Sequence, residues 1–90
     1  MEIVLSPAAK KDLEFWRQSG DLRTKEKISR LLAAIKEDYR KGVGHPEPLK
    51  GKPEGRWSRE ITRKHRLVYR IFETEVYVDV LTAYGHYADK

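Results

Sequence analysis

The chain has 90 residues, no cysteine and a formal net charge of +5. This length predicts a single domain, residues 1–90, with one modest core, and the lack of cysteine excludes disulfides and thiolate metal sites. No apolar run approaches the roughly 20 residues of a membrane span, and the N-terminus does not have the pattern of a signal peptide. We therefore expect a cytoplasmic protein that does not contact a membrane.

The N-terminal residues predict a strand followed by a helix. The opening "MEIVL" is short and apolar, as a buried strand is. Ser6 is a favoured N-cap, and Pro7 suits the first position of a helix. Gly20 is a natural stop for this helix. The helix should bury one stripe, made of Ala9, Leu13 and Trp16.

A second helix follows, with Asp21 as its predicted cap. Its apolar residues keep to one face over more than three turns, while the other face is rich in Lys, Arg and Glu. This spacing predicts a helix that ends near Gly42. The buried face should consist of Ile28, Leu31, Leu32, Ile35 and Tyr39.

The second half of the chain predicts a loop and then three strands. Residues 41–55 are rich in Gly and Pro, so they should form a loop with at most a very short strand. Residues 57–62 and 65–72 alternate between apolar and polar side chains, and residues 76–83 are rich in Val. In the first of these strands, Trp57 and Ile61 should share one face.

The predicted order β-α-α-β-β-β indicates an α+β fold, in which an N-terminal helical hairpin packs on one face of an antiparallel sheet. An antiparallel sheet can leave its other face in contact with water. The alternation in residues 65–72 places Arg66 and Arg70 on that open face, opposite to Leu67 and Tyr69.

The positive charge is concentrated in the middle of the chain. Residues 40–70 hold ten basic and three acidic residues, whereas residues 1–39 hold eight basic and seven acidic ones. Such clustering is typical of proteins that bind a polyanion such as nucleic acid. A basic surface that only aids solubility would produce the same composition.

Cleavage of RNA without a metal needs a general base, a general acid and cations around the phosphate. Glu47 lies between two prolines, which would hold a carboxylate in place, and His86 near the C-terminus could donate a proton. Arg66 could bind phosphate oxygens with both arms of its guanidinium. Lys50 and Arg59 could add charge, and Tyr87 could orient the phosphate or stack on a base. Each of these could also be an ordinary surface residue.

Other kinds of site have less support in the sequence. His45 and His65 have no carboxylate or thiolate neighbours at the spacing of metal ligands, so we expect no metal site. The chain has no Gly-rich phosphate loop before a helix and no nucleophilic Ser or Cys motif. We therefore expect no cofactor.

Three segments in order, "PEPLKG", "WSREITRKHRLVYRI" and "GHY", resemble the YoeB/Txe toxins of the RelE superfamily. The resemblance covers nearly the whole chain. It implies the RelE-like fold, which is similar to that of small microbial ribonucleases. It also implies the toxin of a type II toxin–antitoxin module, a ribosome-dependent mRNA endoribonuclease that cuts in the A site by attack of the 2′-hydroxyl and so inhibits translation.

The resemblance also implies roles for single residues. Glu47 matches the family's general base, Arg66 its phosphate-stabilising arginine, and His86 its general acid. Tyr87 matches the tyrosine that helps to place the phosphate, while Lys50 and Arg59 match basic positions that contact RNA. The chain departs from the family pattern in continuing with Ala88, Asp89 and Lys90 after the tyrosine.

The implied partners are the ribosome with its mRNA and a cognate antitoxin whose acidic C-terminal segment is disordered when free. A homodimer is left open. Two other functions are also open: a non-catalytic toxin of the same fold that inhibits a topoisomerase, and a plain RNA-binding protein.

Overall fold

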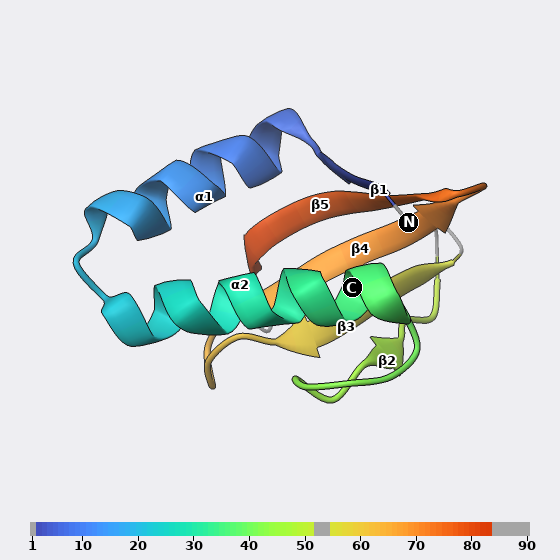
Figure 1. The fold of residues 1–90 in the computed structure, drawn as a ribbon. Helices are drawn as coiled ribbons and strands as arrows, with labels where there is room; N and C mark the ends of the chain where they lie inside the picture. The colour runs from blue at the N-terminus through green and yellow to red at the C-terminus, as the bar shows by residue number, and fades with distance from the viewer. Residues whose placement is uncertain (1, 52–54, 84–90) are drawn as a thin grey trace.

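The computed structural model describes residues 2–51 and 55–83. In these residues a five-stranded sheet carries two helices on one of its faces, as Figure 1 shows. The elements are β1 (Glu2–Leu5), α1 (Pro7–Gln18), α2 (Leu22–Glu37), β2 (Glu47–Pro48), β3 (Arg56–Glu60), β4 (Arg66–Phe72) and β5 (Glu75–Ala83). The predicted α+β class and helical hairpin are confirmed, and the predicted loop holds a two-residue strand, β2.

The strand order is β1-β5-β4-β3-β2. β2, β3, β4 and β5 pair with their neighbours in antiparallel fashion, but β1 runs parallel to β5, with Glu2 opposite Glu75 and Leu5 opposite Val78. The prediction of a fully antiparallel sheet is therefore wrong, and the sheet is mixed. The two helices supply the long connection that a parallel arrangement requires, and the local pattern of β1 holds no information about its direction.

Both helices begin where the sequence predicts. The Ser6 hydroxyl accepts a hydrogen bond from the Ala9 amide at 2.9 Å, and the Asp21 carboxylate accepts one from the Thr24 amide at 3.0 Å. The hydrogen bonds from Thr24 lower the pKa of Asp21. α2 ends at Glu37, earlier than the predicted Gly42, because Asp38 has extended backbone angles. The chain therefore leaves the helix before Tyr39.

The core lies between the helices and the covered face of the sheet. Its buried apolar members come from both helices, from β4 and β5, and from Ile61, the residue after β3. They include most of the predicted stripes of both helices, although Leu13, Leu32 and Tyr39 are only partly buried and Tyr39 lies beyond the end of α2. The fully or nearly fully buried residues are Ala9, Trp16, Ile28, Leu31, Ile35, Ile61, Leu67, Tyr69, Val76 and Val78.

Tyr69 brings a hydroxyl group into this core, with 0% of its surface exposed. Its hydroxyl donates a hydrogen bond to the Tyr39 carbonyl at 2.7 Å and accepts one from Nε of Arg59 at 3.1 Å. Burial raises the pKa of the Tyr69 phenol, while the hydrogen bond from Arg59 opposes this effect. The phenol therefore stays neutral in the folded protein at a pH at which it would ionise in the unfolded chain.

This difference predicts a loss of stability in alkali. Above about pH 10, the ordinary pKa of a tyrosine, the unfolded chain loses the Tyr69 proton while the folded protein keeps it, so the free energy of unfolding falls as pH rises toward the folded pKa. Tyr69→Phe should cost about 1–3 kcal/mol at neutral pH, because it leaves buried hydrogen-bonding groups without a partner. The same variant should lack this part of the alkaline decline.

Urea unfolding from neutral to alkaline pH measures both effects. Tyr77→Phe is the matched control, since it makes the same change on a half-buried side chain of β5, and it should keep the decline seen in the unmodified protein. If the Tyr69→Phe curve ran parallel to that of the unmodified protein across the alkaline range, the buried phenol would not be its source.

Candidate functional site

The sheet face that the helices leave uncovered, here called the open face, carries the candidate site. Side chains alternate between the two faces along a strand, and residues opposite each other in neighbouring strands share a face. β4 thus directs Arg66, Val68 and Arg70 away from the core, as predicted. The pairs Glu47–Ser58 and Ser58–Val68 extend the open face from β4 across β3 to β2.

Glu47 is held on the edge strand of the sheet. It pairs with Ser58 on β3, and the amide of Leu49 donates a hydrogen bond to the Arg56 carbonyl at 2.8 Å. Pro46 and Pro48 flank it, which fits an edge strand because a proline has no amide to donate to a further strand. The two prolines also restrict the backbone. The Glu47 side chain nevertheless stays 65% exposed.

The Glu47 carboxylate and the Arg66 guanidinium form an ion pair across β3. Their nearest oxygen and nitrogen are 3.9 Å apart, and the Arg66 side chain is 36% exposed. At this separation and exposure the pair contributes little to folding, about 1 kcal/mol or less. The structure thus brings together the residues predicted to act as base and as phosphate ligand.

Two residues of β3 and β4 that share a face with this pair are small or apolar, and they are not exposed to solvent. Ser58 is 0% exposed and Val68 is 1% exposed. The Ser58 hydroxyl has no hydrogen-bond partner in the described part of the chain, and sequence reasoning missed it. Strict alternation with Trp57 could have placed it on the open face beside Glu47. Residues 42–47 line a broad hollow that opens to solvent next to Glu47.

β5 is irregular beside Arg66. Its register against β4 shifts twice between Arg66 and Tyr69, so β5 holds extra residues there. Such bulges are frequent next to active sites, where they change the direction of a side chain. The last residue of β5, Ala83, is opposite Arg66.

The other predicted residues differ in their surroundings. Lys50 is exposed two residues after β2. His86 and Tyr87 lie outside the described residues, as do Ala88 to Lys90, so their roles stay predictions.

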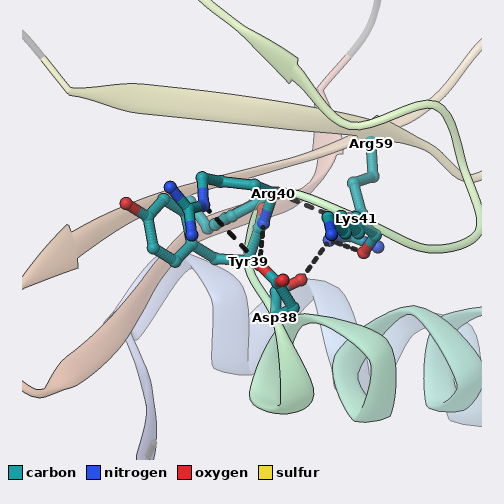
Figure 2. Close-up of polar contacts among 6 residues, drawn as sticks. Asp38, Tyr39, Arg40, Lys41 and Arg59 are labelled. Atoms are coloured by element: carbon teal, nitrogen blue, oxygen red, sulfur yellow. Dashed lines mark hydrogen bonds and ion pairs between the residues drawn. The ribbon is translucent and has the colours of Figure 1, made fainter.

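The prediction that Arg59 contacts RNA is wrong for this fold. Arg59 lies on β3 between Trp57 and Ile61, the residue that follows the strand, and it points into the core, where it is 0% exposed. Its guanidinium donates to Tyr69 and to the carbonyls of residues in the loop after α2 (Figure 2). A buried side chain with these contacts is not available to a phosphate.

Arg70 is on the open face but already has intramolecular partners. Its Nε lies 3.4 Å from a carboxylate oxygen of Asp79, and its guanidinium lies 5.2 Å from the centre of the Tyr77 ring. Both contacts stabilise the cation. Arg66 is therefore the better candidate for a phosphate ligand on this strand.

The described residues offer neither a metal-binding cluster nor a helix that could span a membrane. Residues 2–51 and 55–83 hold no group of three or more His, Asp or Glu side chains that could bind a metal ion. Within the same ranges, neither helix is long and apolar enough to cross a membrane.

Comparison with known proteins identifies relatives of this chain. The family model described as YoeB-like toxin of bacterial type II toxin-antitoxin system matches residues 5–87. Toxin YoeB of Mycobacterium bovis is 44% identical over 81 residues, which make up 90% of this chain and 92% of that protein.

Solved structures agree. A YoeB/ParE toxin from Agrobacterium tumefaciens has a TM-score of 0.85 and 39% identity, covering 91% of this chain and 96% of its own. A YoeB dimer and a heterotetrameric YoeB–YefM toxin–antitoxin complex, both from Staphylococcus aureus, give TM-scores of 0.83 and 0.82. Each is 32% identical and covers 93% of this chain and 97% of its own. The chain therefore belongs to the YoeB-like toxins of bacterial type II toxin–antitoxin systems.

Proposed function

We propose that the protein is an endoribonuclease that cuts mRNA on the ribosome, in the cytoplasm, and so inhibits translation. One observation supports this most directly: the Glu47 carboxylate lies 3.9 Å from the Arg66 guanidinium on the open face. A proton acceptor next to a cation is what attack of a 2′-hydroxyl on its neighbouring phosphate requires. Membership of the YoeB-like toxins supports the same substrate.

The proposed reaction uses side chains alone. Glu47 takes the proton of the 2′-hydroxyl, and the resulting oxygen attacks the adjacent phosphorus. The bond from phosphorus to the 5′-oxygen breaks, and His86 donates a proton to that leaving oxygen. The products are a 2′,3′-cyclic phosphate and a 5′-hydroxyl. Arg66 stabilises the extra negative charge on the phosphate in the transition state.

The resting ion pair suits this division of roles. A phosphate that approaches Arg66 competes with Glu47 for the guanidinium, and breaking an exposed pair at 3.9 Å costs little. Once Arg66 binds the phosphate, the Glu47 carboxylate is released next to the ribose that it must deprotonate. The substrate itself would therefore convert the resting pair into a base and a phosphate ligand.

The described end of β5 lies beside Arg66. Ala83 is opposite Arg66 in the sheet, and His86 follows three residues later, a span of at most about 11 Å for an extended chain. We assign His86 as the general acid and Tyr87 as the residue that helps to place the phosphate. Lys50, exposed after β2, contributes positive charge for the RNA backbone.

The open geometry of the site supports the requirement for the ribosome. Glu47 is 65% exposed, and the neighbouring hollow opens to solvent. An attacking hydroxyl must be held in line with the leaving oxygen for an efficient reaction. We infer that the ribosome supplies part of this alignment by holding the mRNA.

The first test concerns Arg66. Arg66→Ala should fold normally and slow cleavage by about 10²–10³-fold, the usual effect of removing one group that stabilises transition-state charge. Primer extension on mRNA from an in vitro translation reaction measures the cuts. Arg17→Ala removes the same charge from an exposed position on α1 and should cut normally. If Arg66→Ala cleaved mRNA as fast as the wild type, the role of Arg66 as phosphate ligand would be refuted. If the unmodified protein made no cuts, the proposed endoribonuclease activity would be refuted.

The second test separates base from acid. As general base, Glu47 must be ionised to accept a proton, and as general acid, His86 must be protonated to donate one. Glu47→Gln should therefore abolish the acidic limb of the pH–rate profile, and His86→Gln the basic limb. An RNA with sulfur in place of the bridging 5′-oxygen has a leaving group that needs no protonation. It should restore cleavage by His86→Gln but not by Glu47→Gln. The reverse result would mean that Glu47 is the general acid and His86 the general base.

We further propose that a cognate antitoxin covers the site with an acidic C-terminal segment that is disordered when free. The excess of basic residues in 40–70 supports this, because a chain of opposite charge that folds on binding can block an RNA site. A homodimer is a further proposed assembly. The Staphylococcus aureus structures, a YoeB dimer and a YoeB–YefM toxin–antitoxin complex, provide precedents for a dimer and for an antitoxin partner.

The antitoxin proposal predicts that a small acidic protein encoded beside the toxin will co-purify with it, even at high salt. Removing the acidic C-terminal segment should restore mRNA cleavage in the translation reaction. If the shortened antitoxin inhibited cleavage as well as the full-length protein, the inhibitory contact would lie elsewhere.

A further inference from the structure

We propose that Arg59 is a positioning residue for Glu47. Its buried guanidinium holds together residues 38–44, here called the α2–β2 loop, and this loop fixes where Glu47 lies beside Arg66. The proposal rests on the proposed function, since it concerns the residue assigned there as the general base. It gives Arg59 a role that depends on burial and not on contact with RNA.

All the hydrogen-bond partners of the Arg59 side chain lie on the covered side of the sheet. Its Nη1 donates to the Val43 carbonyl at 3.0 Å, and its Nη2 donates to the carbonyls of Asp38 at 3.1 Å and Lys41 at 2.7 Å. Its Nε donates to the Tyr69 hydroxyl, which in turn donates to the Tyr39 carbonyl. Figure 2 shows the side chain reaching from its strand to the backbone that follows α2. One side chain thus binds or bridges to four residues of the loop.

The buried Arg59 guanidinium needs the loop carbonyls to replace its lost water, and those carbonyls need Arg59 as their hydrogen-bond donor. Removing a charge from water is unfavourable unless other groups replace the water, and none of the ion pairs between described residues involves Arg59. Backbone carbonyls at the end of α2 supply the compensation, with the negative end of the helix dipole close by. Without Arg59, the carbonyls of Val43 and Lys41 would lose their partner in the core.

The loop packs too closely to take another path. Gly44 has φ +88°, and a Cβ atom there would meet Leu31 at 2.5 Å. Gly42 has φ +113°, and a Cβ there would lie 3.1 Å from Nη1 of Arg59. The Gly44 carbonyl also accepts a hydrogen bond from the Glu60 amide at 2.7 Å. Gly44 is therefore fixed between α2 and β3, three residues before Glu47.

The link to the site is short and stiff. After Gly44 the chain passes through His45, which has φ 52°, and Pro46 before Glu47 pairs with Ser58. β2 has only two residues, so its own hydrogen bonds hold it weakly. A catalytic group displaced by about 1 Å can lose about 10²-fold in rate. The hydrogen bonds of Arg59 to the loop therefore determine how well Glu47 is aligned.

Two variants test the proposal. Arg59→Lys keeps the charge but loses the planar fork that binds several carbonyls at once. Tyr69→Phe keeps the core ring and removes only the bridge from Arg59 to Tyr39. Val76→Ala is the matched control, because it weakens the core at a fully buried residue of β5 with no contact to the loop among those described. The unfolding free energy of each variant shows which variants can be compared at equal stability.

The readouts separate positioning from stability. In the folded protein, amide hydrogen exchange at Lys41 and Glu60 should speed up in Tyr69→Phe and Arg59→Lys, while exchange in the middle of α2 does not. On ribosomes programmed with mRNA, kcat should fall by about 10-fold for Tyr69→Phe and up to about 10²-fold for Arg59→Lys, with KM nearly unchanged. Val76→Ala should alter neither the loop exchange nor kcat.

Each outcome decides the question. Wild-type loop exchange in both variants would overturn the proposal, and so would a wild-type kcat. A loss of kcat in Val76→Ala as large as in Tyr69→Phe would also overturn it, since general loss of stability would then explain both. If Arg59→Lys does not fold, Tyr69→Phe decides alone. If the unmodified protein cuts no mRNA, the proposed function fails, whereas the exchange experiment still decides whether Arg59 holds the loop.

Discussion

Two helices of this length can cover one face of the sheet and no more, and this one-sided coverage organises the molecule. The helices bury the side of β4 that carries Leu67 and Tyr69, so the intervening side chains must face outward. A strand with one buried face has a fixed register, because a shift by one residue would exchange its faces. The packing of the helices on one side therefore determines that Arg66 and Glu47 meet on the other.

The parts of the fold that depend on nearby residues could be predicted from the sequence. The Ser6 and Asp21 caps act on amides three residues away, and the apolar stripes of the helices repeat every three or four residues. The parallel pairing of β1 could not be predicted, because β1 meets β5 from almost the opposite end of the chain. The sequence also predicts an end of α2 near Gly42, which is later than the observed end at Glu37, for a related reason. Tyr39 continues the apolar spacing, yet it packs edge-on against Trp57, with ring centres 5.6 Å apart, from outside the helix.

The candidate site was predictable to a similar degree. The resemblance to the toxin family singled out Glu47 and Arg66, but their proximity depends on β3 lying between their strands. The resemblance and its positive charge assign Arg59 to RNA, although alternation with Trp57 and Ile61 places it on the core face. Arginine is rarely buried without a partner. The partners here are backbone carbonyls of a loop, and no sequence pattern reveals those.

The arginines of residues 57–71 show why the charge of a segment does not measure its affinity for RNA. Arg59 is bound by carbonyls in the core, and Arg70 is bound by Asp79, whose side chain is 19% exposed. A phosphate could recruit Arg59 only by leaving buried carbonyls without a partner, which costs far more than breaking an exposed pair. To recruit Arg70 it would have to replace Asp79, a partner that is less exposed than Glu47. Arg66 has a weakly held partner in Glu47, and the phosphate can replace that partner at little cost. The binding of RNA on this face thus depends on which cations have replaceable partners, and the resting partner of Arg66 is the group proposed to act next in the reaction.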